Sequence, residues 1–333
     1  MNLNEITGQK EIIKRLKKLI LDDKVGHAYI FTGAKGIGKR TIAGAFSHML
    51  LCDMPDEHGP CNKCTPCRLW IEGSNPDFFK IEAGGDNILI DEVRSMQNEI
   101  IVKPLYSRRK VVLIADAEKM TVQAQNCLLK VLEEPPLYAV IILTSSNYEA
   151  LLGTIRSRVT RFTLSRYTKD EMKEIIVSNI IFNTKHENSD IQFILNYSDG
   201  IPGVALSLVS STDFIKMRDQ AIEVAHKLNN MKDIEVLDIY GFFDKNRDDI
   251  GIILDIITTF YRDLVVIKTG GTENMLINSD KKNKIVSEAG NYSIERLINN
   301  IEIVEAARTS IKQNVNYQLN IENMILRLQN QVN

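Results

Sequence analysis

The chain has 333 residues, too many for one small core, so two or three domains are expected. Apolar residues make up 44% and charged residues 25%, which is the ordinary composition of a globular protein in water. The net charge of −2 excludes nucleic-acid binding driven by the overall charge, so any contact with DNA needs a local basic patch or a partner.

No stretch reaches the ~18 consecutive apolar residues of a membrane span. The N-terminal sequence MNLNEITGQKEIIKRLKK also lacks the apolar core of a signal peptide. We therefore expect a cytoplasmic protein without a membrane partner. In that reducing compartment, clustered cysteines indicate metal ligands rather than disulfides.

Residues 1–165 alternate between short apolar runs and helical patterns. We expect strands at 27–33, 77–83, 110–116, 139–146 and 161–164, and helices at 8–23, 39–51, 88–101 and 121–133. The runs are apolar on both faces, which is typical of a mostly parallel sheet covered by helices on both sides. The predicted fold class of this part is α/β.

The stretch GAKGIGKRTIA nearly matches the phosphate-binding loop G-x-x-x-x-G-K-[ST] and follows a predicted strand. Its glycines are Gly33, Gly36 and Gly38. Lys39 fits the lysine that reaches the β- and γ-phosphates, and backbone N–H groups at the helix start suit the phosphates themselves. Arg40, however, replaces the hydroxyl residue that holds Mg²⁺. Thr41 is one residue on, about 100° around the helix.

A second weakness lies in KVVLIADAEKM, the strand that should end in the acids of a metal-dependent ATPase. Ala115 stands where one carboxylate is expected, and the acid that remains, Asp116, stands at the general-base position. Two interpretations of Arg40 are open, since it can occupy the phosphate pocket or repel phosphate from it. Nucleotide binding without efficient hydrolysis is open as well.

Four cysteines follow the spacing C-x8-C-x2-C-x2-C: Cys52, Cys61, Cys64 and Cys67. Four thiolates at such spacing can close a tetrahedral site, and four protein ligands leave no position for a reactive water. We therefore predict a structural zinc ion. The alternatives are unliganded surface cysteines, or His58 in place of one cysteine. Cys127 is read as a small packed apolar residue.

After residue 166 the strand signals stop and helical spacing takes over, interrupted by a turn at 197–203 and the loop KTGGTENM. The expected organisation is an α/β core at 1–165 with a metal-binding insert at 52–67, a small helical domain at 166–207 and a larger helical domain at 208–333.

Several motifs occur together in one order: GHAYIFTGAKGIGKRTIA, CNKCTPC, NPDFFKI, AQNCLLKVLEEPP and TIRSR. In this the chain resembles bacterial clamp-loader subunits of the AAA+ class, and most of all the delta-prime type from DNA polymerase III. The resemblance runs from Gly8 to about Leu206. It implies an AAA+ core, a helical lid at 166–207 and a helical collar at 208–333, the last by position and length only.

The resemblance also implies a role. Such subunits form a ring that opens a sliding clamp and loads it at primer–template junctions, so the implied partners are the gamma/tau and delta subunits, the clamp and primer–template DNA. Each ATP site of the ring is completed by an arginine from a neighbouring subunit, in a Ser-Arg-Cys motif. Here that arginine is Arg158, with valine in place of cysteine. A simple helix-capping role is the alternative for Arg158.

Two further family positions bear on ATP. Thr144 matches the first sensor, although a plain strand-end hydroxyl is an equal interpretation. The lid arginine of the pattern G-x-x-R-x-A-L is replaced by Gly203. With Arg40 and Ala115, three features of an ATPase are missing. The pattern is that of a stator, which completes its neighbour's site, is not itself an ATPase, and belongs to a polymerase holoenzyme.

Two other functions were weighed. An active motor subunit of the gamma/tau type predicts intact metal-binding motifs and a lid arginine, which this sequence lacks. A zinc-finger regulator that binds DNA predicts a basic recognition helix, whereas the loop between Cys52 and Cys61 is acidic.

Overall fold

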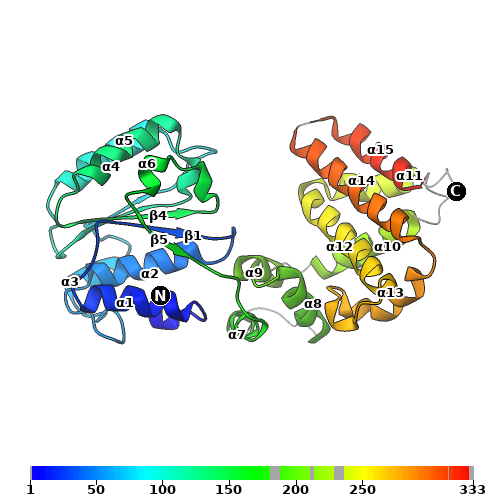
Figure 1. Cartoon of the computed structure of the whole chain (residues 1–333), viewed down its shortest axis with the longest axis horizontal. Coiled ribbons are helices and arrows are strands. Elements are labelled where there is room, and N and C mark those ends of the chain that lie inside the picture. The colour runs from blue at the N-terminus through cyan, green and yellow to red at the C-terminus, as the bar shows by residue number, and fades with distance from the viewer. Residues whose placement is uncertain (1, 181–187, 211–213, 229–235, 314, 330–333) are drawn as a thin grey trace. The chain divides into compact units, whose positions relative to one another are not determined.

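A computed structural model describes residues 2–180, 188–210, 214–228, 236–313 and 315–329 (Figure 1). The chain divides into two compact units, Met1–Ser178 with Gly200–Val204 and Asn179–Asp199 with Ala205–Asn333. The predicted lid, residues 166–207, is divided between the two units, so the division of the chain into three domains stays a prediction. Among the described residues, no helix is both long and apolar enough to cross a membrane.

The first unit is built on a five-stranded parallel sheet in the order β2-β3-β4-β1-β5. Every residue of the three inner strands is buried, whereas the two edge strands are partly exposed. The prediction of a parallel sheet is confirmed, strand by strand. The strands are β1 (Ala28–Thr32), β2 (Phe78–Ile81), β3 (Lys110–Ile114), β4 (Ala139–Ser145) and β5 (Thr160–Thr163).

Helices cover both faces of this sheet (Figure 1). The first three lie on one face and the next three on the other: α1 (Lys10–Leu21), α2 (Lys39–Leu51) and α3 (Thr65–Ile71), then α4 (Ile90–Ile101), α5 (Val122–Glu133) and α6 (Gly153–Arg156). The four helices predicted in this part are confirmed. The short α3 was not predicted, because its seven residues follow Cys64 directly and carry no apolar period.

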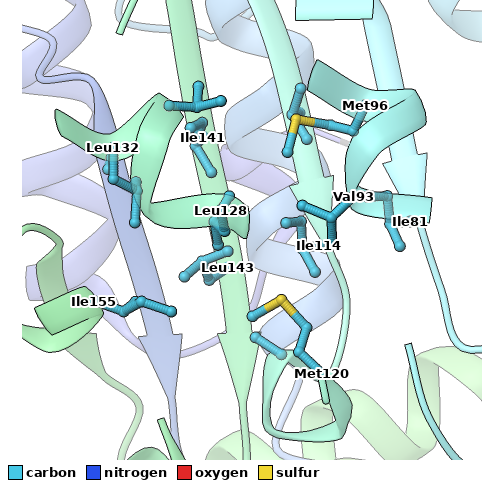
Figure 2. Packing of buried hydrophobic residues seen from close by; sticks show 14 of the residues in the cluster. Ile81, Val93, Met96, Ile114, Met120, Leu128, Leu132, Ile141, Leu143 and Ile155 are labelled. Carbon is cyan, nitrogen blue, oxygen red and sulfur yellow. The ribbon is translucent and has the colours of Figure 1, made fainter. Parts of the chain in front are cut away.

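One face of the sheet and the helices α4 and α5 enclose an apolar cluster (Figure 2). Strand residues such as Ile114, Ile141 and Leu143 meet Val93 of α4 and Leu128 of α5, all fully buried. The sheet therefore supports α4 and α5 through close packing, and α5 is held firmly along its length.

Leu128→Ala is expected to lower the free energy of unfolding of the first unit by about 2–5 kcal/mol, because truncating a fully buried leucine leaves a cavity. Urea denaturation followed by circular dichroism measures this change. The control is Val122→Ala at the start of the same helix, where the side chain is 58% exposed and a change within about 0.5 kcal/mol is expected. Equal effects of the two variants would contradict this packing.

The second unit is all helical, as predicted for the chain beyond residue 208. Its long helix α12 packs against α10, α13 and α14. The loop KTGGTENM does interrupt the helices and contains one 3₁₀ turn, Glu273–Met275. The helices are α8 (Asn188–Ser198), α9 (Pro202–Ser210), α10 (Phe214–Leu228), α11 (Val236–Lys245), α12 (Ile250–Lys268), α13 (Lys282–Ala289), α14 (Ile294–Lys312) and α15 (Tyr317–Gln329); α7 (Lys169–Ile180) precedes them.

A buried polar network holds the loop before α13 onto α10 and α12. The Arg218 guanidinium, 1% exposed, donates to both carboxylate oxygens of Asp280 at 2.6 Å and lies 3.7 Å above the Phe193 ring. Asp263 on α12 accepts hydrogen bonds from the backbone and side-chain amides of Asn278. Buried charges are tolerated here because each one is paired and hydrogen-bonded.

Candidate functional site

The phosphate-loop sequence has the local structure that its pattern predicts. Strand β1 ends at Thr32, the loop turns through Gly33, Gly36 and Gly38, and α2 begins at Lys39. Gly38 is the residue before the helix and has a φ of +100°, a conformation that side chains with a Cβ rarely adopt. Strand, loop and helix N-terminus are thus arranged as in a phosphate-binding loop.

Lys39 is turned onto its own loop. Its ammonium donates to the carbonyls of Gly33 at 2.8 Å and Ala34 at 2.9 Å, and to Ser146 Oγ at 3.1 Å. The side chain is buried, and burial lowers the pKa of the ammonium while the Glu118 and Asp116 carboxylates oppose that shift. A phosphate bound here would have to compete with these three hydrogen bonds.

Arg40 contacts the acids at the ends of two neighbouring strands. Its guanidinium lies 2.8 Å from Asp116, which follows β3, and 2.9 Å from Glu82, which follows β2. The guanidinium therefore pairs with carboxylates, a contact that neither interpretation of Arg40 named. It thereby engages Asp116, the carboxylate that remains at the end of β3.

Two more of the predicted nucleotide-site residues are Thr144, which contacts Asp116, and Thr41 on α2. The buried Thr144 hydroxyl accepts a hydrogen bond from the backbone N–H of Asp116 at 3.0 Å. Thr144 therefore makes the local hydrogen bond expected of a hydroxyl at the end of a strand. Thr41 is exposed on α2, one position beyond Arg40.

Gly203, at the lid-arginine position, touches the phosphate loop directly. Its N–H donates to the carbonyl of Gly36 at 2.9 Å. A Cβ on Gly203 would lie 2.8 Å from the Gly36 Cα and carbonyl oxygen, closer than atoms can pack. Any larger residue at 203, arginine included, would force the two segments apart.

Sequence reasoning missed three polar residues of this site: Glu82, Glu118 and Ser146. Glu82 and Ser146 directly follow strands β2 and β4, and the carboxyl ends of parallel strands meet at one edge of a sheet, so their positions were a usable signal. Glu118 accepts the backbone N–H of Ser146 at 3.0 Å.

Arg158 lies just after the short helix α6. Its guanidinium donates to the Thr154 carbonyl at 3.0 Å and to Ser157 Oγ at 3.4 Å, and it forms an ion pair with Glu133 at 2.9 Å. The side chain is 36% exposed. The capping contact weighed for Arg158 is therefore present in the chain by itself, together with an ion pair that the sequence did not suggest.

The four cysteines predicted as metal ligands come together. Their sulfur atoms all lie within 4.8 Å of one another. A tetrahedral zinc site with Zn–S bonds of ~2.3 Å places its sulfurs about 3.8 Å apart, so the donor set fits such an ion. Backbone N–H groups point at two of the sulfurs, from Cys61 to Cys52 at 3.2 Å and from Cys64 to Cys61 at 3.4 Å.

Burial raises the pKa of the Cys52 thiol to about 11 and also raises that of Cys67. A bound cation reverses this preference, because thiolate is the form that binds metal. His58 is outside this cluster among the described residues; its backbone N–H binds Asp56 and its carbonyl binds Asn2. Cys127 packs against the core on α5, as predicted.

Comparison with known families decides where the chain belongs. The model of the family "DNA polymerase III, delta subunit" matches residues 8–168, and that of the C-terminal part of the same subunit matches residues 212–330. The chain belongs to this DNA polymerase III delta-subunit family.

Relatives within DNA polymerase III fall into two groups. The delta' subunit of Bacillus subtilis is 27% identical, and the match covers 98% of this chain and 97% of that protein. The tau subunit of the same organism is 29% identical over 82% of this chain, but the chain spans only 51% of its length. This member of the delta-subunit family is thus a homologue of clamp-loader subunits of DNA polymerase III.

A solved structure supports the fold. A DNA polymerase III gamma-subunit-related protein from Thermotoga maritima superposes with a TM-score of 0.50 and 19% identity, covering 96% of this chain and 98% of that one. The delta-family chain has the fold class expected from its sequence: an AAA+-like parallel-sheet domain and a C-terminal all-helical region.

Proposed function

We propose that the chain is the delta-prime, or stator, subunit of a bacterial clamp loader, which helps to place the sliding clamp on primed DNA. The match to the Bacillus subtilis delta' subunit over nearly the whole of both chains supports this proposal. The observation that carries it is the position of Arg40, which pairs with Asp116 and Glu82 where an ATPase binds magnesium.

The ATP site of this chain is degenerate in this proposal for three physical reasons. The guanidinium of Arg40 neutralises carboxylates that would otherwise attract Mg²⁺. Lys39 is engaged by its own loop. Gly203 contacts Gly36 so closely that a lid arginine has no room. Hydrolysis of ATP needs the metal and these cations to stabilise charge on the transferring phosphoryl group.

Arg40→Thr tests this account of the site. The wild-type chain is expected to bind ATP no more tightly with Mg²⁺ than with EDTA. The threonine variant frees Asp116 and adds the missing hydroxyl, so a dependence on Mg²⁺ of roughly tenfold is expected, equal to about 1.4 kcal/mol. Titration calorimetry measures both affinities.

The control for that experiment is Arg94→Thr, since Arg94 forms a surface ion pair with Asp91 on α4. It should leave ATP binding unchanged. Tight, Mg²⁺-dependent binding of ATP by the wild-type chain would contradict the role given to Arg40.

Arg158 is the residue that this subunit contributes to catalysis in the proposal. It completes the ATP site of a neighbouring gamma/tau subunit and stabilises the charge that develops on the γ-phosphate. Its support is the match to the family's Ser-Arg-Cys motif and a partly exposed position after α6. To act on a neighbour's phosphate, the guanidinium leaves the Glu133 carboxylate, and the Nη1 contacts with Thr154 and Ser157 lie within its own segment.

We further propose that Cys52, Cys61, Cys64 and Cys67 hold a structural zinc ion. The spacing of the four sulfurs supports this proposal. Asn2 and Asn4 donate to the carbonyls at 58 and 57, so the metal-binding loop also carries the N-terminal 3₁₀ turn.

The proposed partners are the gamma/tau and delta subunits, with the clamp and primer–template DNA reached through the assembled complex in the cytoplasm. In this proposal residues 1–165 are the AAA+ core, 166–207 the lid and 208–333 the collar that joins the ring. The C-terminal family match to residues 212–330 supports a distinct collar.

A motor of the gamma/tau type is the second candidate, since the tau subunit of Bacillus subtilis is 29% identical over 82% of this chain. Such a motor hydrolyses ATP by itself, which the stator does not. The two proposals therefore differ in a single measurable property of the isolated chain.

Reconstitution tests the proposed function. The organism's gamma/tau and delta subunits are purified and mixed with clamp, ATP and primed circular DNA, with and without this chain. Clamp loading is expected only when the chain is present. Loading at the same rate without it, or failure of the chain to co-purify with gamma/tau and delta, would reject the stator role.

A further inference from the structure

We propose that Glu133 is a positioning residue for Arg158: its carboxylate holds the arginine in the free subunit and must release it when the neighbour's phosphate arrives. This inference rests on the proposed function, because it concerns the arginine that acts in trans. It adds a second residue, on a different helix, to the machinery that this subunit presents to its neighbour.

The geometry divides the guanidinium between two anchors. One nitrogen, Nη1, donates to the Thr154 carbonyl and to Ser157 Oγ, both within the same short segment as Arg158. The other, Nη2, lies 2.9 Å from Glu133 Oε1. The hydrogen bonds of Nη1 hold the guanidinium close to its own segment, and the ion pair of Nη2 with Glu133 neutralises its charge.

Glu133 is the last residue of α5, a helix packed firmly against the sheet. The negative end of the helix dipole lies there, so both the carboxylate and the helix C-terminus attract a cation. Among the described residues, Glu133 forms no ion pair with a cation other than Arg158. The pairing thus fixes the place of the arginine relative to the rigid part of the domain.

The ion pair is also weak enough to exchange. Glu133 is 50% exposed and Arg158 36% exposed, and pairs of this kind contribute only about two- to fivefold to an equilibrium. A γ-phosphate carries more charge and offers the guanidinium a bidentate partner. The neighbour's nucleotide can therefore displace the carboxylate, and the displaced carboxylate returns to water.

This arrangement predicts the effect of Glu133→Gln. The variant keeps the size of the side chain and removes its charge, so Arg158 no longer has to leave an ion pair. In the complex with the organism's gamma/tau and delta subunits, kcat/KM for DNA-stimulated ATP hydrolysis is expected to rise two- to fivefold. Because exposed charges are screened by salt, the gain should shrink as ionic strength rises.

Two further variants separate this role from a general charge effect. Glu134→Gln removes the neighbouring exposed carboxylate and should leave kcat/KM unchanged, because in the described part of the chain the carboxylate paired with Arg158 is that of Glu133. Glu133→Gln combined with Arg158→Ala should equal Arg158→Ala alone, because Glu133 acts only through the arginine.

Each outcome has a distinct meaning. If Arg158→Ala slows turnover but Glu133→Gln leaves kcat/KM unchanged, the positioning role is overturned and the stator proposal stands. The same conclusion follows if Glu134→Gln raises kcat/KM as much as Glu133→Gln does. If Arg158→Ala leaves turnover unaffected, the arginine acting in trans is rejected, and the inference fails with it. A gain confined to Glu133→Gln that vanishes without Arg158 supports the inference.

Discussion

Arg158→Ala is expected to slow ATP hydrolysis at the site that it completes by 10³–10⁵-fold, the usual worth of an arginine supplied in trans. The reason is electrostatic, since a fixed guanidinium stabilises charge on the γ-phosphate more in the transition state than in the ground state. The complex holds several ATP sites. In a single-turnover experiment with the variant, the amplitude of ATP hydrolysis should therefore fall by the fraction of bound ATP that one site holds.

Arg156→Ala is the matched control for this result. Arg156 stands two residues earlier, is similarly exposed and pairs with Glu149, so it tests the loss of a nearby positive charge alone. It should leave the single-turnover amplitude unchanged. Equal amplitudes for wild type and Arg158→Ala would contradict the proposed role of Arg158.

Removal of the proposed zinc ion is expected to cost about 4 kcal/mol of stability when free zinc is about 1,000 times its dissociation constant, because metal bound only by the folded chain adds to its stability. Cys67→Ser should have the same effect, since Cys67 is fully buried within the cluster. Atomic emission should find one zinc per wild-type chain and none in the variant, with a lower melting temperature.

Cys127→Ser is the control, because this cysteine lies on α5 outside the cluster. It should retain the metal. Purified wild-type chain without metal, with a melting temperature that a chelator does not move, would contradict a structural zinc ion.

Much of the fold could be predicted from the sequence because its signals are local. The inner strands read as continuous apolar runs since both faces are buried, and the phosphate loop and the four cysteines are recognisable by spacing alone. The helices of the first unit that were not predicted are α3, with seven residues, and α6, with four, and both are too short to show a period.

The contacts that decide the chemistry could not be predicted, because they join residues distant in sequence. Arg40 pairs with Asp116, 76 residues on, a contact that neither of the two interpretations from the sequence named. The pairing of Arg158 with Glu133 likewise depends on where α5 ends beside α6. A pattern shows which residues reach one edge of a sheet, but not which side chains meet there.

In the helical unit, too, contacts between residues distant in sequence could not be predicted from local patterns. The helical spacing noted beyond residue 166 includes Ala221 and Leu228, which are buried in α10. Arg218 lies on the same helix and is also buried, against the expectation for a charged side chain. Its partners, Asp280 and Asn278, come from a loop about 60 residues away, and no periodicity could indicate them.

The most direct test of the stator proposal is ATP hydrolysis by the isolated chain, measured with primed DNA and Mg²⁺ present. We expect no turnover above the buffer background, because Arg40 occupies the acids that would hold the metal and Gly203 leaves no room for a lid arginine. Hydrolysis by the isolated chain that is abolished by Lys39→Ala would contradict this account and identify the protein as a motor subunit.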